Sequence, residues 1–233
     1  TQIDPNTVEV PLASITGGIS FDTLAGNDSV VLDLSAGNFI PVGGLSYDGG
    51  TGGDDALAVM VAGSVQYTPD AAIFGNGQIN VGTSLITFTG LEPVDFDFFG
   101  PGTFTLTLPG ANDVVDISNG ATVLGGLDAL VLSGSSGGVP FETAHVRDAS
   151  SITIDTTTVA GTDSVTISSA SNGHNNAALT ITTGAEGGDQ IIVNGTATFS
   201  GTTTLNASTI HVNANVTNAV TGTSATTVNV AAP

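Results

Sequence analysis

The chain has 233 residues, of which 40% are hydrophobic and only 9% are charged, a balance that excludes intrinsic disorder and allows a sizeable core. Its 21 acidic residues face one basic residue, Arg147, which gives a net charge of −20. A chain with one basic side chain cannot neutralise phosphates, so nucleic acids and anionic membranes are excluded as partners. No apolar run is long enough to cross a bilayer, so no membrane insertion is expected. The absence of cysteine excludes disulfides, thiolate metal sites and cysteine catalysis.

Strand-like segments follow one another along the whole chain, whereas helical periodicity is nearly absent. These segments are short, rich in β-branched and aromatic residues, and bounded by Gly, Asn, Asp or Ser. In chain order they cover residues 8–10, 29–34, 56–61, 85–88, 103–108, 114–117, 129–132, 152–154, 165–167, 179–182, 190–193, 196–199, 209–212 and 227–230. The gaps between them are shorter than a crossover helix requires. We therefore predict an all-β fold.

One short phrase recurs six times: a small residue, a spacer and an aspartate lead into a strand with apolar residues at alternate positions. The aspartates of the six copies are Asp28, Asp55, Asp113, Asp128, Asp163 and Asp189. A repeated unit of this kind is typical of structures that stack on themselves. We therefore predict a parallel β-helix, or β-solenoid, with short strands and Gly/Asp corners. Tandem β-sandwich domains are the alternative.

The composition of the chain changes near residue 142. Nine of the ten phenylalanines and eight of the nine prolines lie at or before Phe141. The change predicts an N-terminal solenoid region, residues 1–141, with longer loops that carry aromatic residues. Residues 142–233 are predicted to form a more regular region rich in Thr and Val. The two regions are either separate or parts of one continuous domain.

The repeated aspartate has two interpretations. As a turn residue, it accepts hydrogen bonds from the backbone amides one and two residues further on, while the glycine adopts a positive φ. As a metal ligand, it contributes oxygen to calcium between neighbouring turns. The phrase resembles the nonapeptide of RTX calcium β-rolls, but its copies are not in tandem, so only isolated calcium sites are predicted. The candidate ligands are Asp28, Asp54, Asp55, Asp113 and Asp116.

Catalysis is tested by the carboxylate pairs that glycoside hydrolysis requires. Asp54 with Asp55, or Asp95 with Asp97, would supply such a pair. The chain has no lysine, and anionic sugars need cationic partners. We therefore predict that the protein is not an enzyme. His145 lies near Glu142, Arg147 and Asp148 in the sequence, which we interpret as an ordinary salt-bridged patch.

Two stretches resemble known proteins. Residues 86–94, together with residues 26–30, resemble a unit of very large repetitive surface and secreted proteins of bacteria, notably of planctomycete type. The Thr-rich second half resembles the β-solenoid shafts of filamentous-haemagglutinin-like adhesins. The resemblance implies a bacterial protein at the cell surface or outside the cell, with a structural or adhesive role.

Three functions follow from these observations. The first is a structural, self-associating module of an extracellular fibre, cell-surface stalk or matrix protein, joined head to tail or continued by further repeats. The second is an adhesin or glycan-binding β-helix domain for a cell-surface glycan, in which Phe96, Phe98 and Phe99 would stack on sugar rings. Phenylalanines that fill a wide core are the simpler interpretation of that cluster. A glycoside hydrolase is the third.

Overall fold

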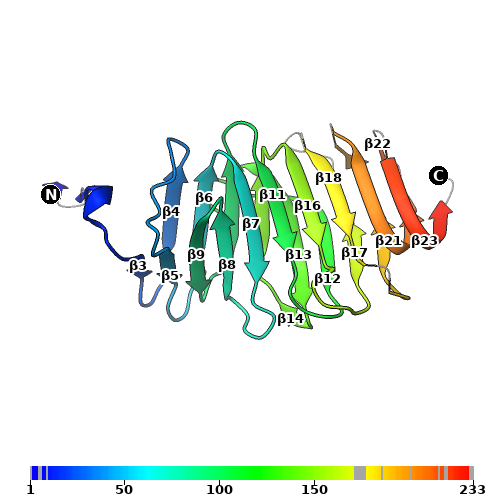
Figure 1. Ribbon diagram of the computed structural model, residues 1–233, viewed down its shortest axis with the longest axis horizontal. Coiled ribbons are helices and arrows are strands. Elements are labelled where there is room, and N and C mark those ends of the chain that lie inside the picture. Colours follow the sequence, from blue (N-terminus) through cyan, green and yellow to red (C-terminus); the bar gives the residue numbers. More distant parts are fainter. Residues whose placement is uncertain are drawn as a thin grey trace.

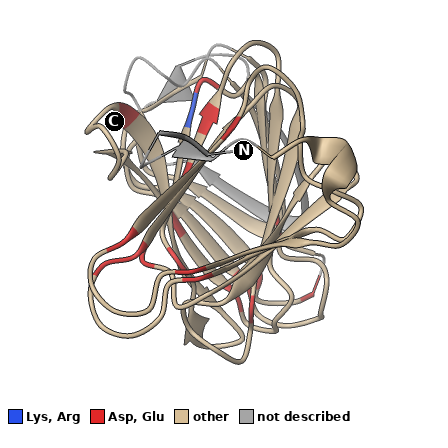
Figure 2. Cartoon of the chain, turned by 90° about the vertical axis from the view of Figure 1, so that its left-hand side faces the viewer, with Lys and Arg blue, Asp and Glu red and all other residues tan. Residues whose placement is uncertain are grey.

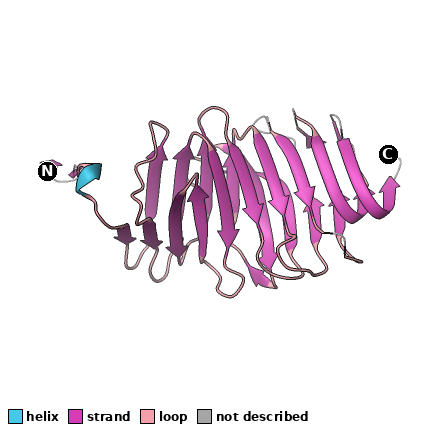
Figure 3. Cartoon of the chain, in the orientation of Figure 1, coloured by secondary structure: helices cyan, strands magenta, loops and turns pink. Residues whose placement is uncertain are grey.

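The computed structural model describes residues 2–4, 7–8, 10–170, 177–184, 186–199, 201–214, 216–217 and 220–230. The described part of the chain is all-β and elongated, with strands along nearly its whole length (Figures 1 and 3). It contains no α-helix, only a 3-10 turn at Leu12–Ser14. The prediction of an all-β fold is confirmed. Among these residues no helix is long and apolar enough to span a membrane.

Most strands belong to two hydrogen-bonded ladders that run along the long axis. The strands of ladder 1 are, in spatial order, β4 (Ser29–Leu34), β6 (Ala56–Val61), β10 (Val94–Phe98), β15 (Ala144–Arg147), β13 (Asp128–Ser136), β12 (Val114–Ala121), β17 (Ser164–Ile167) and β19 (Gln190–Val193). Those of ladder 2 are β3 (Ile19–Asp22), β5 (Leu45–Asp48), β9 (Ser84–Thr89), β8 (Gly77–Val81), β7 (Ser64–Pro69), β11 (Thr103–Thr107), β16 (Ser151–Asp155) and β18 (Ala178–Thr182).

Two long strands connect the ladders at the C-terminal end. β21 (Thr203–Val212) pairs with β18 through its first half and with β19 through its second half. β23 (Val220–Val230) pairs with both halves of β21 and so extends both ladders. Because these strands contribute to both ladders, the whole forms one 19-stranded sheet. The short strands β1 (Gln2–Asp4) and β2 (Thr7–Val8) pair only with each other, β20 (Ala197–Thr198) pairs with β22 (Val216–Thr217), and β14 (Val139–Pro140) extends the β13 pairing.

The chain alternates between the two ladders, and most neighbouring strands within a ladder are parallel. β8 and β13 are the exceptions among the long ladder strands, because each returns antiparallel beside the strand before it. Among the ladder strands, the sequence analysis does not predict β3, β5, β7, β8, β10 or β15. Hydrogen-bonded pairs cross residue 141, as where Val94 of β10 stands opposite Ala144 of β15.

The alternating residue pattern places one set of side chains inside and the other outside. In β16, for example, Ile152 and Ile154 are buried and the residues between them are half-buried. The inward side chains of both ladders belong to one hydrophobic core. The Phe96 ring of ladder 1 packs against Phe104 and Tyr67 of ladder 2, with ring centroids 5.0 and 6.0 Å apart. The end view shows the strands around this interior and acidic residues on several of the surrounding loops and strand ends (Figure 2).

Candidate functional site

Five of the six repeated aspartates lie at one edge of ladder 1. Asp28, Asp55, Asp113, Asp163 and Asp189 each directly precede a parallel strand, namely β4, β6, β12, β17 and β19. Because parallel strands begin at the same edge of a sheet, these residues stack along what we call the leading edge of ladder 1. The sixth copy, Asp128, begins the antiparallel strand β13 and pairs with Ala121, so it lies at the opposite edge.

The carboxylates at the leading edge join one turn of chain to the next. The backbone N–H of Asp28 donates to Oδ1 of Asp55 at 2.8 Å. In the same way Asp113 N–H donates to Asp163 at 2.8 Å, and Asp163 N–H donates to Asp189 at 2.9 Å. The turn prediction is therefore wrong about the hydrogen-bond donor to these carboxylates. The donor is the backbone N–H of the stacked aspartate, and not that of a residue further along the same turn. Stacking places that N–H beside the carboxylate, where it would otherwise have no acceptor.

Aspartates outside the repeated phrase form the turns that the sequence analysis assigns to the phrase. Asp33, Asp48 and Asp155 each accept a hydrogen bond from the backbone N–H two residues further on, at 2.9–3.0 Å. Each lies at or next to the end of a strand, where the chain leaves the ladder. The side chain thus supplies an acceptor that the ladder no longer provides.

The row of acidic residues at the leading edge, which we call the acidic column, continues through two glutamates that the sequence analysis did not select. Glu92 and Glu142 stand two residues before Val94 and Ala144, which pair in neighbouring strands. Glu92 N–H donates to the Asp55 carbonyl at 2.7 Å, which extends the column from the aspartates. The sequence carried a signal for Glu92, because Gly90-Leu91-Glu92-Pro93-Val94 keeps the spacing of the phrase with glutamate in place of aspartate. Glu142 follows Pro140 instead of a small residue and has no such signal.

The predicted calcium ligands do not converge. Asp54 is exposed, Asp55 is buried and accepts the Asp28 amide, and Asp116 accepts a hydrogen bond from the Ser168 hydroxyl. Asp113 accepts the Gly137 N–H at 3.0 Å. Among the described residues no group of three or more His, Asp or Glu side chains is placed to hold a metal ion. Calcium binding stays a prediction.

A pocket of about 410 Å³ opens where the column passes from Asp55 to Glu142. We call it the Glu142 pocket, and its lining residues are Asp54, Phe74, Glu92, Pro93, Val123, Phe141, Glu142, Thr143 and His145. Phe74 comes from the turn between β7 and β8, and Val123 comes from the tip of the β12–β13 hairpin. Both antiparallel insertions therefore contribute to this site, which explains why no local motif marks it.

Glu142 is the most unusual ionisable group in the pocket. Its side chain is 3% exposed, and its Oε1 atom has no hydrogen-bond partner. Burial, reinforced by the negative charge of Glu92, raises the pKa of Glu142 from 4.5 to about 8. Glu142 is therefore mostly protonated at neutral pH. Nearby, the Tyr67 hydroxyl donates to the Glu142 backbone carbonyl at 3.2 Å, and burial raises the pKa of Tyr67 well above 10.

This raised pKa makes stability depend on pH. The folded state holds the Glu142 proton up to about pH 8, whereas the unfolded chain releases it near 4.5. The contribution of Glu142 protonation to the free energy of unfolding is therefore fully present below pH 4.5 and is lost as pH rises to about 8. We expect Glu142→Gln to raise the free energy of unfolding by about 2 kcal/mol at pH 9, with little change at pH 4, because solvent at the pocket mouth screens part of the penalty.

Urea denaturation of both proteins at the two pH values measures this difference. Glu92→Gln serves as the control, since Glu92 is exposed and its neutralisation removes only its repulsion of Glu142. An equal effect of Glu142→Gln at both pH values would contradict the assignment. The raised pKa values of Asp113 and Asp189, caused mainly by burial, act in the same direction in every variant.

His145 is held at the pocket wall by Asp95. Its Nδ1 atom lies 2.9 Å from Asp95 Oδ1, and both side chains are buried. The Asp95 carboxylate also accepts the backbone N–H groups of Val123 and Leu124, at 3.2 and 2.9 Å. These contacts place the hairpin tip over the outer face of β10 and β15. His145 thus has a partner, Asp95, outside the predicted patch. Arg147 pairs with Asp148 of that patch at 3.1 Å and also lies 3.7 Å from Asp97.

The predicted aromatic cluster is divided by the strand alternation. Phe96 and Phe98 are buried in the core, whereas Phe99 is 46% exposed. Only Phe99 is therefore placed to contact a ligand. The carboxylate pairs considered for hydrolysis are divided in the same way, because Asp55 and Asp95 are buried and hydrogen-bonded to backbone amides.

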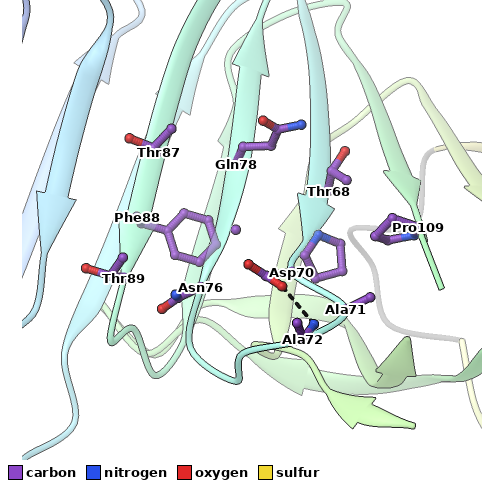
Figure 4. A pocket seen from close by; sticks show the side chains of 12 residues that line it. Thr68, Asp70, Ala71, Ala72, Asn76, Gln78, Thr87, Phe88, Thr89 and Pro109 are labelled. Carbon is purple, nitrogen blue, oxygen red and sulfur yellow. Dashed lines mark hydrogen bonds between the residues drawn. The ribbon is translucent and has the colours of Figure 1, made fainter. Parts of the chain in front are cut away.

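A larger pocket, of about 580 Å³, lies over β7, β8 and β9 (Figure 4). Its polar side chains come mainly from neutral residues, including Thr68, Asn76 and Gln78. Its single charged group, Asp70, accepts the backbone N–H of Ala72 at 2.7 Å, which fixes the β7–β8 turn. No buried polar atom without a partner is found among its lining residues. This pocket offers less distinctive chemistry than the Glu142 pocket.

Comparison of the chain with protein-family models, with curated proteins and with solved structures gives no match.

Proposed function

We propose that this chain is a structural module, a β-solenoid segment of an extracellular fibre, stalk or matrix protein that associates head to tail. The supporting observation is that, among the residues the structure describes, the two ladders are open at both ends. Within these residues β3 and β4 pair only with β5 and β6, and β23 pairs only with β21. These open edges lie at opposite ends of the elongated body (Figure 1). An unpaired strand edge is a template for another strand.

The two ends match in the order of their ladders. At the N-terminal end the chain passes from ladder 2 in β3 to ladder 1 in β4. At the other end β23 also contributes first to ladder 2 and then to ladder 1. A second copy placed end to end would therefore continue both ladders in phase and in the parallel direction. The exposed side chains of Phe21, Leu24 and Val31 near the N-terminal edge would be covered by that contact.

One substitution tests the edge without breaking the ladder. The Ala56 N–H donates to the Asp28 carbonyl at 2.9 Å, so even-numbered residues of β4 bond to β6 and odd-numbered ones face the open edge. Val31→Pro therefore removes an edge donor, whereas Val31→Thr keeps it. We expect linear assemblies for the unchanged protein and for Val31→Thr in electron microscopy and sedimentation velocity, and single copies for Val31→Pro.

Circular dichroism of the Val31→Pro protein confirms that it is folded before the comparison is made. Monodisperse single copies of the unchanged protein at every concentration would overturn the proposal. Assembly of Val31→Pro to the same extent as Val31→Thr would show that this edge is not the contact.

A further inference from the structure

We propose that the Glu142 pocket binds an uncharged sugar unit of a glycan. This inference goes beyond the structural role and does not depend on self-association, because the pocket lies within a single copy of the chain. Its volume of about 410 Å³ falls in the range of small-ligand sites, which is about 300 to 1,000 Å³.

The walls of the pocket fit the two kinds of surface that a pyranose ring presents. Phe74 is 48% exposed and Val123 is 51% exposed, and together with Pro93 they offer apolar surface for the C–H groups of a sugar ring. Phe141, also in the lining, is buried. Small-ligand pockets are usually lined by hydrophobic and aromatic side chains with a few polar groups, and this lining has that composition.

The polar groups of the pocket complete the match. Glu142 lines the pocket, its side chain is almost fully buried, and its Oε1 atom has no hydrogen-bond partner within the protein. A buried polar atom without a partner carries an energetic cost that a ligand removes when it supplies the hydrogen bond. A protonated carboxyl group has both a donor and an acceptor, the pair that a sugar hydroxyl complements. Glu92 and Asp54, both exposed, add acceptors for further hydroxyls.

Charge and geometry narrow the class of ligand. The carboxyl groups of Asp54 and Glu92 at the same pocket, on a chain with a net charge of −20, disfavour anionic sugars. No group of three or more His, Asp or Glu in the described ranges is placed for a metal ion, and a protonated Glu142 is a poor partner for a cation. A neutral glycan unit is the class that meets all of these conditions.

The test begins with binding to defined probes. Saturation-transfer NMR and calorimetry with the methyl glycosides of glucose, galactose, mannose, xylose and N-acetylglucosamine are expected to detect binding of at least one of them. Glucuronic acid and tetramethylammonium represent the anionic and cationic classes, and both are expected to bind at least tenfold more weakly. Absence of binding by every neutral sugar, or preferred binding of the ammonium ion, would overturn the proposal.

Variants then locate the site. Phe74→Ala is expected to weaken binding of the best sugar about tenfold, as is Glu142→Ala, which removes both the donor and the acceptor. Phe39→Ala is the matched control, since Phe39 is 36% exposed and lies outside the pocket lining, and should leave the affinity unchanged. Because Phe74 is half-exposed, its replacement leaves the core intact and keeps the test valid if Glu142→Ala folds poorly. Unchanged affinity in Phe74→Ala would contradict the site.

The pH dependence provides a separate readout. Glu142→Gln keeps a donor and an acceptor, so its affinity at pH 6 should stay within about threefold of the unchanged protein. Above pH 8 the unchanged protein loses the Glu142 proton and should bind more weakly, whereas the glutamine variant should not. The other ionisable groups that face Glu142 are Glu92, Asp54, His145 and Tyr67, and they are common to both proteins. An equal loss of affinity in both proteins would assign the pH dependence to one of these other groups and would contradict a role for Glu142 in binding.

Discussion

Phe96→Ala is expected to lower the free energy of unfolding by about 4 kcal/mol, the largest effect of any substitution considered for this protein. The Phe96 ring is fully buried and contacts Phe104 and Tyr67, which come from the opposite ladder. Its removal leaves a cavity between the ladders and also removes two aromatic contacts, each of which contributes about 1 kcal/mol. Urea denaturation at constant pH measures the difference.

Phe99→Ala is the control for this prediction, because Phe99 belongs to the same cluster in the sequence but is exposed. Its effect should stay within about 0.5 kcal/mol, as is usual for surface substitutions. Similar losses for the two variants would contradict the position of Phe96 between the ladders. The comparison also separates the two interpretations of the cluster, since a residue of a sugar site would affect binding and not stability.

Asp163→Ala is expected to lower the free energy of unfolding by about 3 kcal/mol. The buried Asp163 carboxylate accepts two hydrogen bonds, from the Asp113 N–H at 2.8 Å and from the Thr156 hydroxyl at 2.6 Å. Alanine leaves both donors buried without an acceptor. The loss arises from the leading edge of ladder 1, and it therefore measures how strongly the repeated aspartate joins successive turns.

Asp163→Asn separates this role from a need for negative charge. The amide oxygen still accepts the Asp113 N–H, and the amide nitrogen can donate to the Thr156 hydroxyl oxygen. We expect a loss within about 1 kcal/mol, measured by the same urea titration. Two results together would instead favour a metal ligand at this position. They are a loss in Asp163→Asn as large as that in Asp163→Ala, and stabilisation by added calcium of the unchanged protein but not of the variant.

The behaviour of the repeated phrase shows what a local pattern can and cannot indicate. Alternating apolar residues after each aspartate correctly predict strands such as β4 and β6, with the same bounds as in the structure. The phrase itself does not reveal which amide its carboxylate accepts. Asp55 lies 27 residues from its donor Asp28, whereas Asp163 lies 50 residues from Asp113, because the hairpin of β12 and β13 is inserted between the stacked turns.

The candidate site was less accessible to sequence analysis than the fold. Glu142 and His145 were recognised as neighbours in the sequence, but the pocket that they line is completed by Phe74 and Val123, which come from two separate insertions. Asp54 was selected as a calcium ligand for its place in a glycine-rich phrase, and its position in the wall of the pocket was not predicted. No spacing within the sequence encodes this convergence.

The sequence by itself determined the class of fold, the inside and outside of the strands that it predicted, and the chemistry that a chain with one basic residue and no cysteine cannot perform. These properties are local or compositional, since alternation along a strand decides which side chains are buried. Only the tertiary structure decided that the chain alternates between two ladders, that five aspartates and two glutamates share one edge, and that Glu142 is buried without a partner. Register between distant strands is set by packing of the whole core, and for this reason the sequence alone could not determine it.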